Sequence, residues 1–218
     1  DEPRFSLAEP RAIGAADRLG MGAAKHAGPA RDAVDADHLV VLRFSENNAS
    51  HDRGVSSVPR ELRKHIEERL STVAHVVTST EGASTRLRKR SGEYLEVAPD
   101  DFLHLLAGAD LHVGDSGSVT TEAAILGVPT LRIAATRRAI ITELARRYGL
   151  VADFSLSDDH AFLENLEGCI ARIDDIRSSF AACHAELMSE TADVVGWFAD
   201  LCTEVTISSS RKRCDERP

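Results

Sequence analysis

Residues 109–129 read ADLHVGDSGSVTTEAAILGVP, and this stretch decides the fold of the chain. A short apolar segment at 111–114 is followed by a turn of small polar residues and then by a helix pattern that ends at Gly127. This order predicts one unit of a parallel α/β sheet. The helix leaves its first backbone N–H groups unpaired at the turn, where its dipole adds positive charge. The stretch therefore predicts a site for an anion such as a phosphate or a diphosphate.

Side chains around the turn complete the predicted anion site. Gly117 would let a ligand approach the backbone closely, and the hydroxyl groups of Ser116, Ser118 and Thr120 could donate hydrogen bonds. Glu122 lies further along the helix, where its carboxylate could accept hydrogen bonds from sugar hydroxyl groups. These residues predict contacts to both the phosphates and the sugar of one ligand.

Two other interpretations of the turn follow from the residues. In the first interpretation, the small residues allow a strand to pack closely against a helix and bind no ligand. The GDSG segment at 114–117 also resembles the nucleophile segment of some serine hydrolases. The segment 157–160, SDDH, has Ser157 where a GDS-type esterase would carry its late aspartate, so we do not expect Ser116 to be a nucleophile.

The sequence on either side of this stretch alternates between strand and helix patterns. We predict strands at 39–44, 73–78, 94–97, 111–114 and 130–133, and helices at 59–70, 100–108, 140–148, 158–172 and 174–202. The fold class is therefore α/β, a doubly wound parallel sheet flanked by helices. We assign residues 38–205 to this Rossmann-like domain, 1–37 to a linker or the remnant of a missing N-terminal half, and 206–218 to a disordered tail.

Most charged and aromatic residues outside the turn are assigned to the solvated surface or to core packing. The basic run at 86–90 is interpreted as a solvated face, and Trp197 and the phenylalanines of the last helix as core packing. Arg132 lies in the fifth predicted strand, and Arg137 and Arg138 follow it. They could close over a diphosphate or solvate the start of a helix.

The composition argues against several classes of partner. The chain has 35 acidic and 26 basic residues and a net charge of −9, which argues against nucleic acid and anionic membranes as partners. No apolar run approaches the length of a membrane-spanning helix, and the first thirty residues carry no signal-peptide pattern. The cysteines form no CxxC pair, so we expect no metal site and a cytoplasmic protein with reduced thiols at Cys169, Cys183, Cys202 and Cys214.

Polar residues also end or follow two other predicted strands. Ser50 and His51 follow the first strand, and Ser79 and Glu81 end the second. Ligands bind at the carboxyl ends of strands in open parallel sheets, so all four are candidate ligand contacts. His51 is the candidate general base or phosphate donor; the alternative is a turn in which it is merely hydrogen-bonded.

Several motifs in a fixed order carry a resemblance to a known family: LRF at 42–44, NASHDRG at 48–54, STEG at 79–82, GDSG at 114–117 and YGL at 148–150. Over about residues 38–202 the chain resembles the uncharacterised family called domain of unknown function 354, which is related to lipid-A-disaccharide synthase. The STEG segment has one residue more than the corresponding segment of that family. The block at 109–129 is also similar to a segment of UDP-N-acetylglucosamine 2-epimerase, in which a second glycine stands at the position of Ser118. The resemblance implies the C-terminal, donor-side domain of a GT-B-like fold.

The resemblance also implies a function. Ser116, Gly117 and Ser118 would face the diphosphate of a nucleotide sugar, with UDP as the expected nucleotide, and Glu122 would take the position of the ribose-binding carboxylate. The expected protein is the nucleotide-sugar-binding half of a glycosyltransferase-like enzyme. The alternatives are a UDP-sugar 2-epimerase-like half and a non-catalytic module that binds a nucleotide or a partner. No cofactor is expected, because a helix N-terminus and arginine side chains can neutralise the diphosphate. The acceptor domain is expected to be separate or missing, so the chain alone should show negligible turnover.

Overall fold

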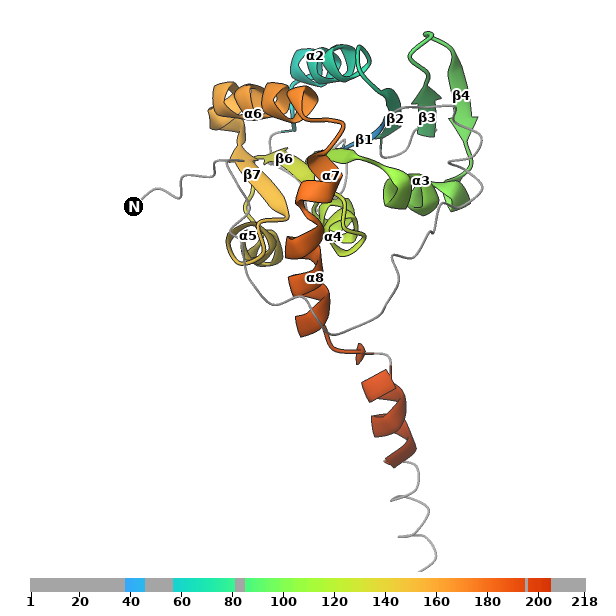
Figure 1. The fold of residues 1–218 in the computed structure, drawn as a ribbon, viewed down its shortest axis with the longest axis vertical. Helices are drawn as coiled ribbons and strands as arrows, with labels where there is room; N and C mark the ends of the chain where they lie inside the picture. Colours follow the sequence, from blue (N-terminus) through green and yellow to red (C-terminus); the bar gives the residue numbers. More distant parts are fainter. Residues whose placement is uncertain (1–37, 46–56, 81–84, 195, 205–218) are drawn as a thin grey trace, which may run out of the picture.

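The computed structural model describes residues 38–45, 57–80, 85–194 and 196–204. Within these residues a seven-stranded sheet has the strand order β4-β3-β2-β1-β5-β6-β7 (Figure 1). Strands β2, β1, β5, β6 and β7 are parallel, whereas β3 and β4 form an antiparallel edge. The strands are β1 (Leu39–Phe44), β2 (His75–Thr80), β3 (Thr85–Arg88), β4 (Tyr94–Val97), β5 (Leu111–Gly114), β6 (Thr130–Ala134) and β7 (Val151–Ser155).

Helices cover both faces of this sheet, which confirms the predicted doubly wound α/β class (Figure 1). Helices α2, α6 and α7 pack on one face; α3 and α4 pack on the other, where α5 and α8 continue the layer. None of the helices in the described ranges is long and apolar enough to cross a membrane. The helices are α2 (Arg60–Leu70), η2 (Pro99–Asp101), α3 (Phe102–Gly108), α4 (Gly117–Ile125), α5 (Ala139–Arg146), η3 (Leu156–Asp158), α6 (Asp159–Ala171), α7 (Ile176–Ser179) and α8 (Ala181–Glu190).

Strand β1 shows why a continuous apolar run forms the centre of the sheet. Successive side chains of a strand point to opposite faces. Leu39 and Val41 are buried on the face covered by α3 and α4, and Val40, Leu42 and Phe44 are buried on the face covered by α2 and α6. Both faces are covered by helices, so the strand is apolar on both sides.

The observed strand bounds agree with the predicted bounds at β1, β4 and β5 and differ at β2 and β6. Strand β2 begins at His75 rather than at residue 73, because the N–H groups of Val73 and Ala74 both donate to the Leu70 carbonyl in the turn after α2. Strand β7 is missing from the predicted set, because Asp153 and Ser155 interrupt its apolar run.

The basic run at 86–90 belongs in part to an edge strand, and its basic side chains are exposed or half-buried, as expected for a solvated face. Residues 85–88 form β3, which pairs antiparallel with both β2 and β4. Leu87 is buried in the core under α3, while Arg86 and Arg88 are directed to the opposite face. A single buried leucine between arginines is too weak a pattern to identify such a strand from sequence.

The C-terminal helical region is not one long helix with an apolar packing side. Helices α7 and α8 are followed by extended backbone at Thr191, and a further helix then comprises residues 194 and 196–204. Trp197 and Phe198 are 62% and 58% exposed in this last helix, so their predicted role in the core is wrong. Helix α8 itself packs against the domain through Leu187.

Candidate functional site

The predicted anion turn lies where the strand order of the sheet reverses direction. From β1 the chain moves to β2 on one side, and β5 then pairs with β1 on the other side. In open α/β sheets the crevice at the carboxyl ends of two such strands is the usual ligand site. Arg43 and Gly114 are register partners near these two strand ends, and α4 begins three residues after Gly114. The turn therefore occupies the topological switch point.

Gly114 is required by the close contact between β1 and the turn. A Cβ atom at this position would lie 2.0 Å from the carbonyl oxygen of Arg43 and 2.9 Å from its carbonyl carbon. The same oxygen accepts a hydrogen bond from the Asp115 N–H at 3.2 Å. Because the blocking atoms belong to the backbone, no change of rotamer could make room for a side chain here.

The N-terminus of α4 is partly exposed at the turn. Ser116 is the N-cap residue, with extended backbone and no side-chain capping bond within the described residues. Its hydroxyl oxygen lies 3.3 Å from that of Ser118, and its carbonyl accepts the N–H of Thr120. Ser116 and Gly117 are half-buried and Ser118 is exposed. The first N–H groups of a helix have no partner within the helix, so they can bind an anion.

Arg138 lies across this helix N-terminus. A Cβ atom on Gly117 would lie 2.8 Å from Cδ and 2.9 Å from Nε of the Arg138 side chain. Arg138 is exposed and is the N-cap residue of α5, so the start of α5 brings a guanidinium group to the start of α4. An arginine beside unpaired N–H groups can bind phosphate oxygens in a bidentate manner.

Arg132 is not available to a ligand, and the suggestion that it could close over a diphosphate is wrong. It is 1% exposed in β6, where its guanidinium donates to Asp153 Oδ1 at 2.7 Å and to the Thr136 carbonyl at 3.0 Å. Its side chain therefore stabilises the fold between β6 and β7. Arg137, by contrast, is exposed next to Arg138.

Asp115 and Arg63 hold the end of β1 beside the turn, and sequence reasoning assigned neither residue a role. The Ser45 N–H donates to Asp115 Oδ1 at 2.6 Å, and Arg63 donates to the Ser45 carbonyl at 2.9 Å and to the Val58 carbonyl at 2.8 Å. The Arg63 guanidinium also lies 5.3 Å from the ring centroid of Phe44. Burial raises the pKa of the Asp115 carboxyl, while hydrogen bonds from Ser45 and the charges of Arg63 and of the buried Arg132 oppose this shift. The sequence did carry a signal for Asp115, because it is an acidic residue directly after a buried strand.

The other predicted site residues have different positions. Thr120 is fully buried, and its hydroxyl has no hydrogen-bond partner within the described residues, so it faces the core rather than the partly exposed end of α4. Glu122 is half-buried and lies four residues after Ser118, which places both on one face of α4. Thus Ser118 and Glu122 share a face on which Thr120 does not lie.

Ser79 lies at the same edge of the sheet but takes part in a network within the protein. It is 4% exposed, and its hydroxyl oxygen accepts hydrogen bonds from Arg43 at 2.7 Å and from Thr85 at 3.0 Å. The candidate ligand contacts Ser50, His51 and Glu81 lie outside the described residues. Whether His51 and Ser116 share one rim therefore stays a prediction.

His112 precedes the turn on β5 and is buried as a neutral side chain. Neither ring nitrogen has a hydrogen-bond partner within the described residues, and burial lowers the pKa of His112 from 6.5 to about 3. In the unfolded chain the same imidazole takes up a proton below pH 6.5. The unfolded state is therefore favoured as the pH falls from 6.5 towards 3, and His112 offers no acid or base at neutral pH.

We expect the His112→Leu variant to lose less folding stability in acid than the parent chain. Between pH 7.5 and 5.0 this histidine should account for about 2 kcal/mol of the loss in the free energy of unfolding. Urea unfolding followed by circular dichroism at both pH values measures the difference between the variant and the parent chain. His104→Gln, which changes an exposed histidine on α3, is the matched control and should keep the full pH dependence. Identical pH profiles for the parent chain and His112→Leu would contradict the expectation.

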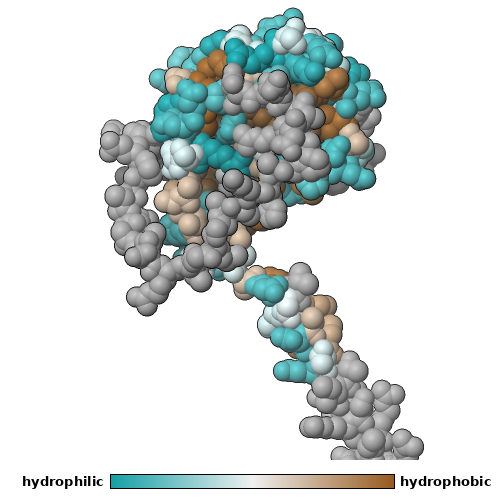
Figure 2. Space-filling model, turned by 45° about the vertical axis from the view of Figure 1, so that its right-hand side comes forward, coloured by the Kyte–Doolittle hydropathy of each residue, from teal (hydrophilic) through white to brown (hydrophobic). Residues whose placement is uncertain are grey.

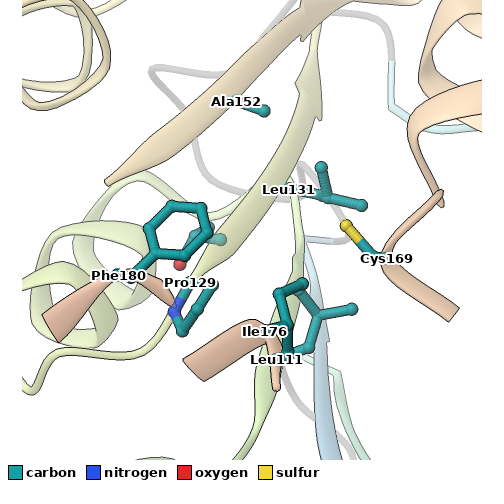
Figure 3. A pocket seen from close by; sticks show the side chains of 8 residues that line it. Leu111, Pro129, Leu131, Ala152, Cys169, Ile176 and Phe180 are labelled. Atoms are coloured by element: carbon teal, nitrogen blue, oxygen red, sulfur yellow. The ribbon is translucent and has the colours of Figure 1, made fainter. Parts of the chain in front are cut away.

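A small apolar cavity lies at the opposite end of the strands from the turn. Its volume is about 10 Å³, room for about one water molecule. Figure 3 shows side chains from the starts of β5, β6 and β7 facing those of Cys169, Ile176 and Phe180. Burial raises the pKa of Cys169 to about 12, so this thiol is not a nucleophile. The cavity is a packing space and not a ligand site.

The comparisons with protein families and with curated proteins add nothing to the geometry of the turn. In the part of the chain that the structure describes, no group of three or more His, Cys, Asp or Glu side chains could hold a metal ion. No known protein-family model matches the chain, and no curated protein matches it. The site is therefore a partly exposed helix N-terminus at a topological switch point, with an arginine lying across it.

Proposed function

We propose that the turn at 114–118 binds the diphosphate of a nucleotide sugar, as the donor side of a glycosyltransferase-like enzyme. The observation that carries this proposal is the position of Arg138 across the partly exposed N-terminus of α4 at the switch point of the sheet. A diphosphate matches this combination, because one phosphate can accept the N–H groups of α4 while the guanidinium neutralises the other.

The sugar side of the proposed ligand follows from the face of α4. Ser118 and Glu122 lie one turn apart on this face. With the phosphates at Ser116 and Ser118, the ribose would lie along the helix, where the Glu122 carboxylate could accept its hydroxyl groups. This arrangement assigns no contacts to the nucleobase or to the sugar that the nucleotide carries. The cytoplasmic location stays a prediction from the cysteine pattern.

Calorimetric titration with UDP and with inorganic pyrophosphate tests this proposal. Arg138→Gln and Ser116→Ala should weaken the binding of both ligands, because each variant removes a donor to a charged phosphate. Such a loss costs roughly 1.5–3 kcal/mol, which is a tenfold or greater loss of affinity. Glu122→Ala should weaken the binding of UDP and leave that of pyrophosphate unchanged, because pyrophosphate has no ribose.

Arg137→Gln is the matched control for the arginine. It removes an exposed guanidinium from the neighbouring position and should leave the affinity for both ligands within twofold, about 0.4 kcal/mol. Failure of the parent chain to bind either ligand would overturn the proposal. Binding that Arg138→Gln and Ser116→Ala both leave unchanged would place the anion site elsewhere.

A further inference from the structure

The last helix of the chain exposes an apolar face. Its helical residues are 194 and 196–204, and we refer to them as the C-terminal helix. Asp193 begins it, because its carboxylate accepts the Gly196 N–H at 2.9 Å and its carbonyl accepts the Trp197 N–H at 3.0 Å. In Figure 2 this part of the chain extends away from the body of the protein, with apolar residues along it. The exposed apolar side chains are Val194 (64% exposed), Trp197 (62%), Phe198 (58%) and Leu201 (38%).

The spacing of these four side chains is that of a docking helix. They stand at positions i, i+3, i+4 and i+7, which share one face of a helix and are the usual anchors of a helix bound in a groove. The rings of Trp197 and Phe198 are in contact, with centroids 6.4 Å apart. Tryptophan is among the residues that contribute most to binding energy at interfaces. The face therefore resembles one half of an interface.

The charges of this region are all of one sign. Residues 181–204 contain no lysine or arginine, and their acidic residues are Glu186, Glu190, Asp193, Asp200 and Glu204. Two copies of the C-terminal helix would repel each other if they paired directly. The surface that covers this face should therefore be basic and should present an aromatic or apolar centre.

The β3–β4 hairpin of the same protein has these properties. Four of the five residues at 86–90 are basic, the highest density in the sequence. Arg88 and Tyr94 are register partners, and the Arg88 guanidinium lies 6.0 Å from the ring centroid of Tyr94, which is 56% exposed. Arg86 stands on the same face two residues earlier, paired with Glu96 across the strands. Leu87 faces the core, so this outer face of the hairpin carries Arg86, Arg88 and Glu96, a net positive charge, around one exposed aromatic ring.

We propose that the C-terminal helix of one copy of this chain docks on the outer face of the β3–β4 hairpin of a second copy. Trp197 and Phe198 would pack against Tyr94 and the stems of Arg86 and Arg88, with the guanidinium groups facing the acidic side chains. Each copy carries both surfaces, so a reciprocal exchange of the two helices gives a closed two-fold dimer. This contact is independent of the anion site and of its ligand.

Docking within one chain is opposed by the attachment of α8. His184 Nε2 lies 2.8 Å from the Ile125 carbonyl, and the Tyr148 hydroxyl donates to Glu190 at 2.6 Å, so α8 is held at the α4 and α5 side. Residues 191–193 then span at most about 10 Å before the C-terminal helix begins. In Figure 1 this helix continues beyond α8, away from the sheet and from the labelled hairpin.

The chain contains a reporter for this contact, because Trp197 is its only tryptophan. Sedimentation equilibrium and Trp197 emission should be measured together over a concentration series. We expect the mass to rise from 23.6 kDa towards twice this value, with the emission shifting to shorter wavelength at the same concentrations. High salt should weaken association, because it screens the opposite charges.

Three variants decide which surfaces are used. Trp197→Ser and the double variant Arg86→Glu/Arg88→Glu should each weaken the dimer at least tenfold. Asp200→Arg mixed with the hairpin double variant should restore association in the mixture. Met188→Ser removes an exposed apolar side chain from α8 and is the matched control, which should dimerise like the parent chain. Circular dichroism checks that each variant keeps its helical content.

Several results would overturn the proposal. A chain that stays monomeric throughout the series has no such contact. An emission shift that does not depend on concentration would show that Trp197 is covered by residues of its own chain. A dimer that survives Arg86→Glu/Arg88→Glu but is lost in Trp197→Ser would show that another surface covers the helix.

Discussion

Gly114→Ala is expected to destabilise the domain by at least about 3 kcal/mol, more than ordinary overpacking of a core. The new Cβ atom would lie 2.0 Å from the Arg43 carbonyl oxygen, and only a shift of the β1 or β5 backbone could relieve this contact. Such a shift separates the two strands at the switch point. It should therefore also move the N-terminus of α4 away from the end of β1.

Urea unfolding followed by circular dichroism measures this loss, and Gly168→Ala is the matched control. Gly168 lies in α6, and a Cβ atom there would meet no atom within 4 Å among the described residues. Alanine is the better helix former, so this control should gain about 0.5–1 kcal/mol. A variant at residue 114 as stable as the parent chain would show that β1 and β5 are not held this closely.

Asp153→Ala is expected to cost about 3–5 kcal/mol, because it leaves a buried guanidinium without its charge partner. Arg132 is 1% exposed, and its Nη1 atom lies 2.7 Å from Asp153 Oδ1. Its Nε atom already lacks a hydrogen-bond partner within the described residues. The double variant Arg132→Met/Asp153→Leu removes both charges and should recover most of the lost stability.

The exposed ion pair between Lys64 and Glu68 provides the control for this result. Its two side chains are 68% and 60% exposed, so Glu68→Gln should change the free energy of unfolding little. Equal losses in the free energy of unfolding for Asp153→Ala and Glu68→Gln, measured by urea unfolding, would contradict the larger loss expected at the buried pair. A double variant less stable than Asp153→Ala would show that the two side chains contribute by packing rather than by charge.

Local sequence patterns determined much of the fold because they depend on neighbouring residues alone. The apolar run at 39–44 is covered on both faces, and its strand has the predicted bounds. Gly127 ends the α4 region with a φ of +70°, a conformation that glycine adopts easily. The unpaired N–H groups at Gly117 follow from helix geometry, so the strand, turn and helix of the candidate site were predictable.

The remaining features depend on residues that are distant in the sequence. No local pattern shows that β5 pairs with β1 and so places the turn at a switch point, or that the start of α5 brings Arg138 onto Gly117. The sequence does not show which partner an arginine meets. Arg138 follows β6 and meets a helix N-terminus, whereas Arg132 lies within β6 and meets a buried carboxylate. Apolar spacing likewise identified the face that holds Trp197, but not whether anything covers it. The sequence by itself determined which segments form strands, turns and helices, because the chemistry of each segment is local. Only the tertiary structure decided which side chains meet, because strand order and helix docking bring together residues that no short pattern relates.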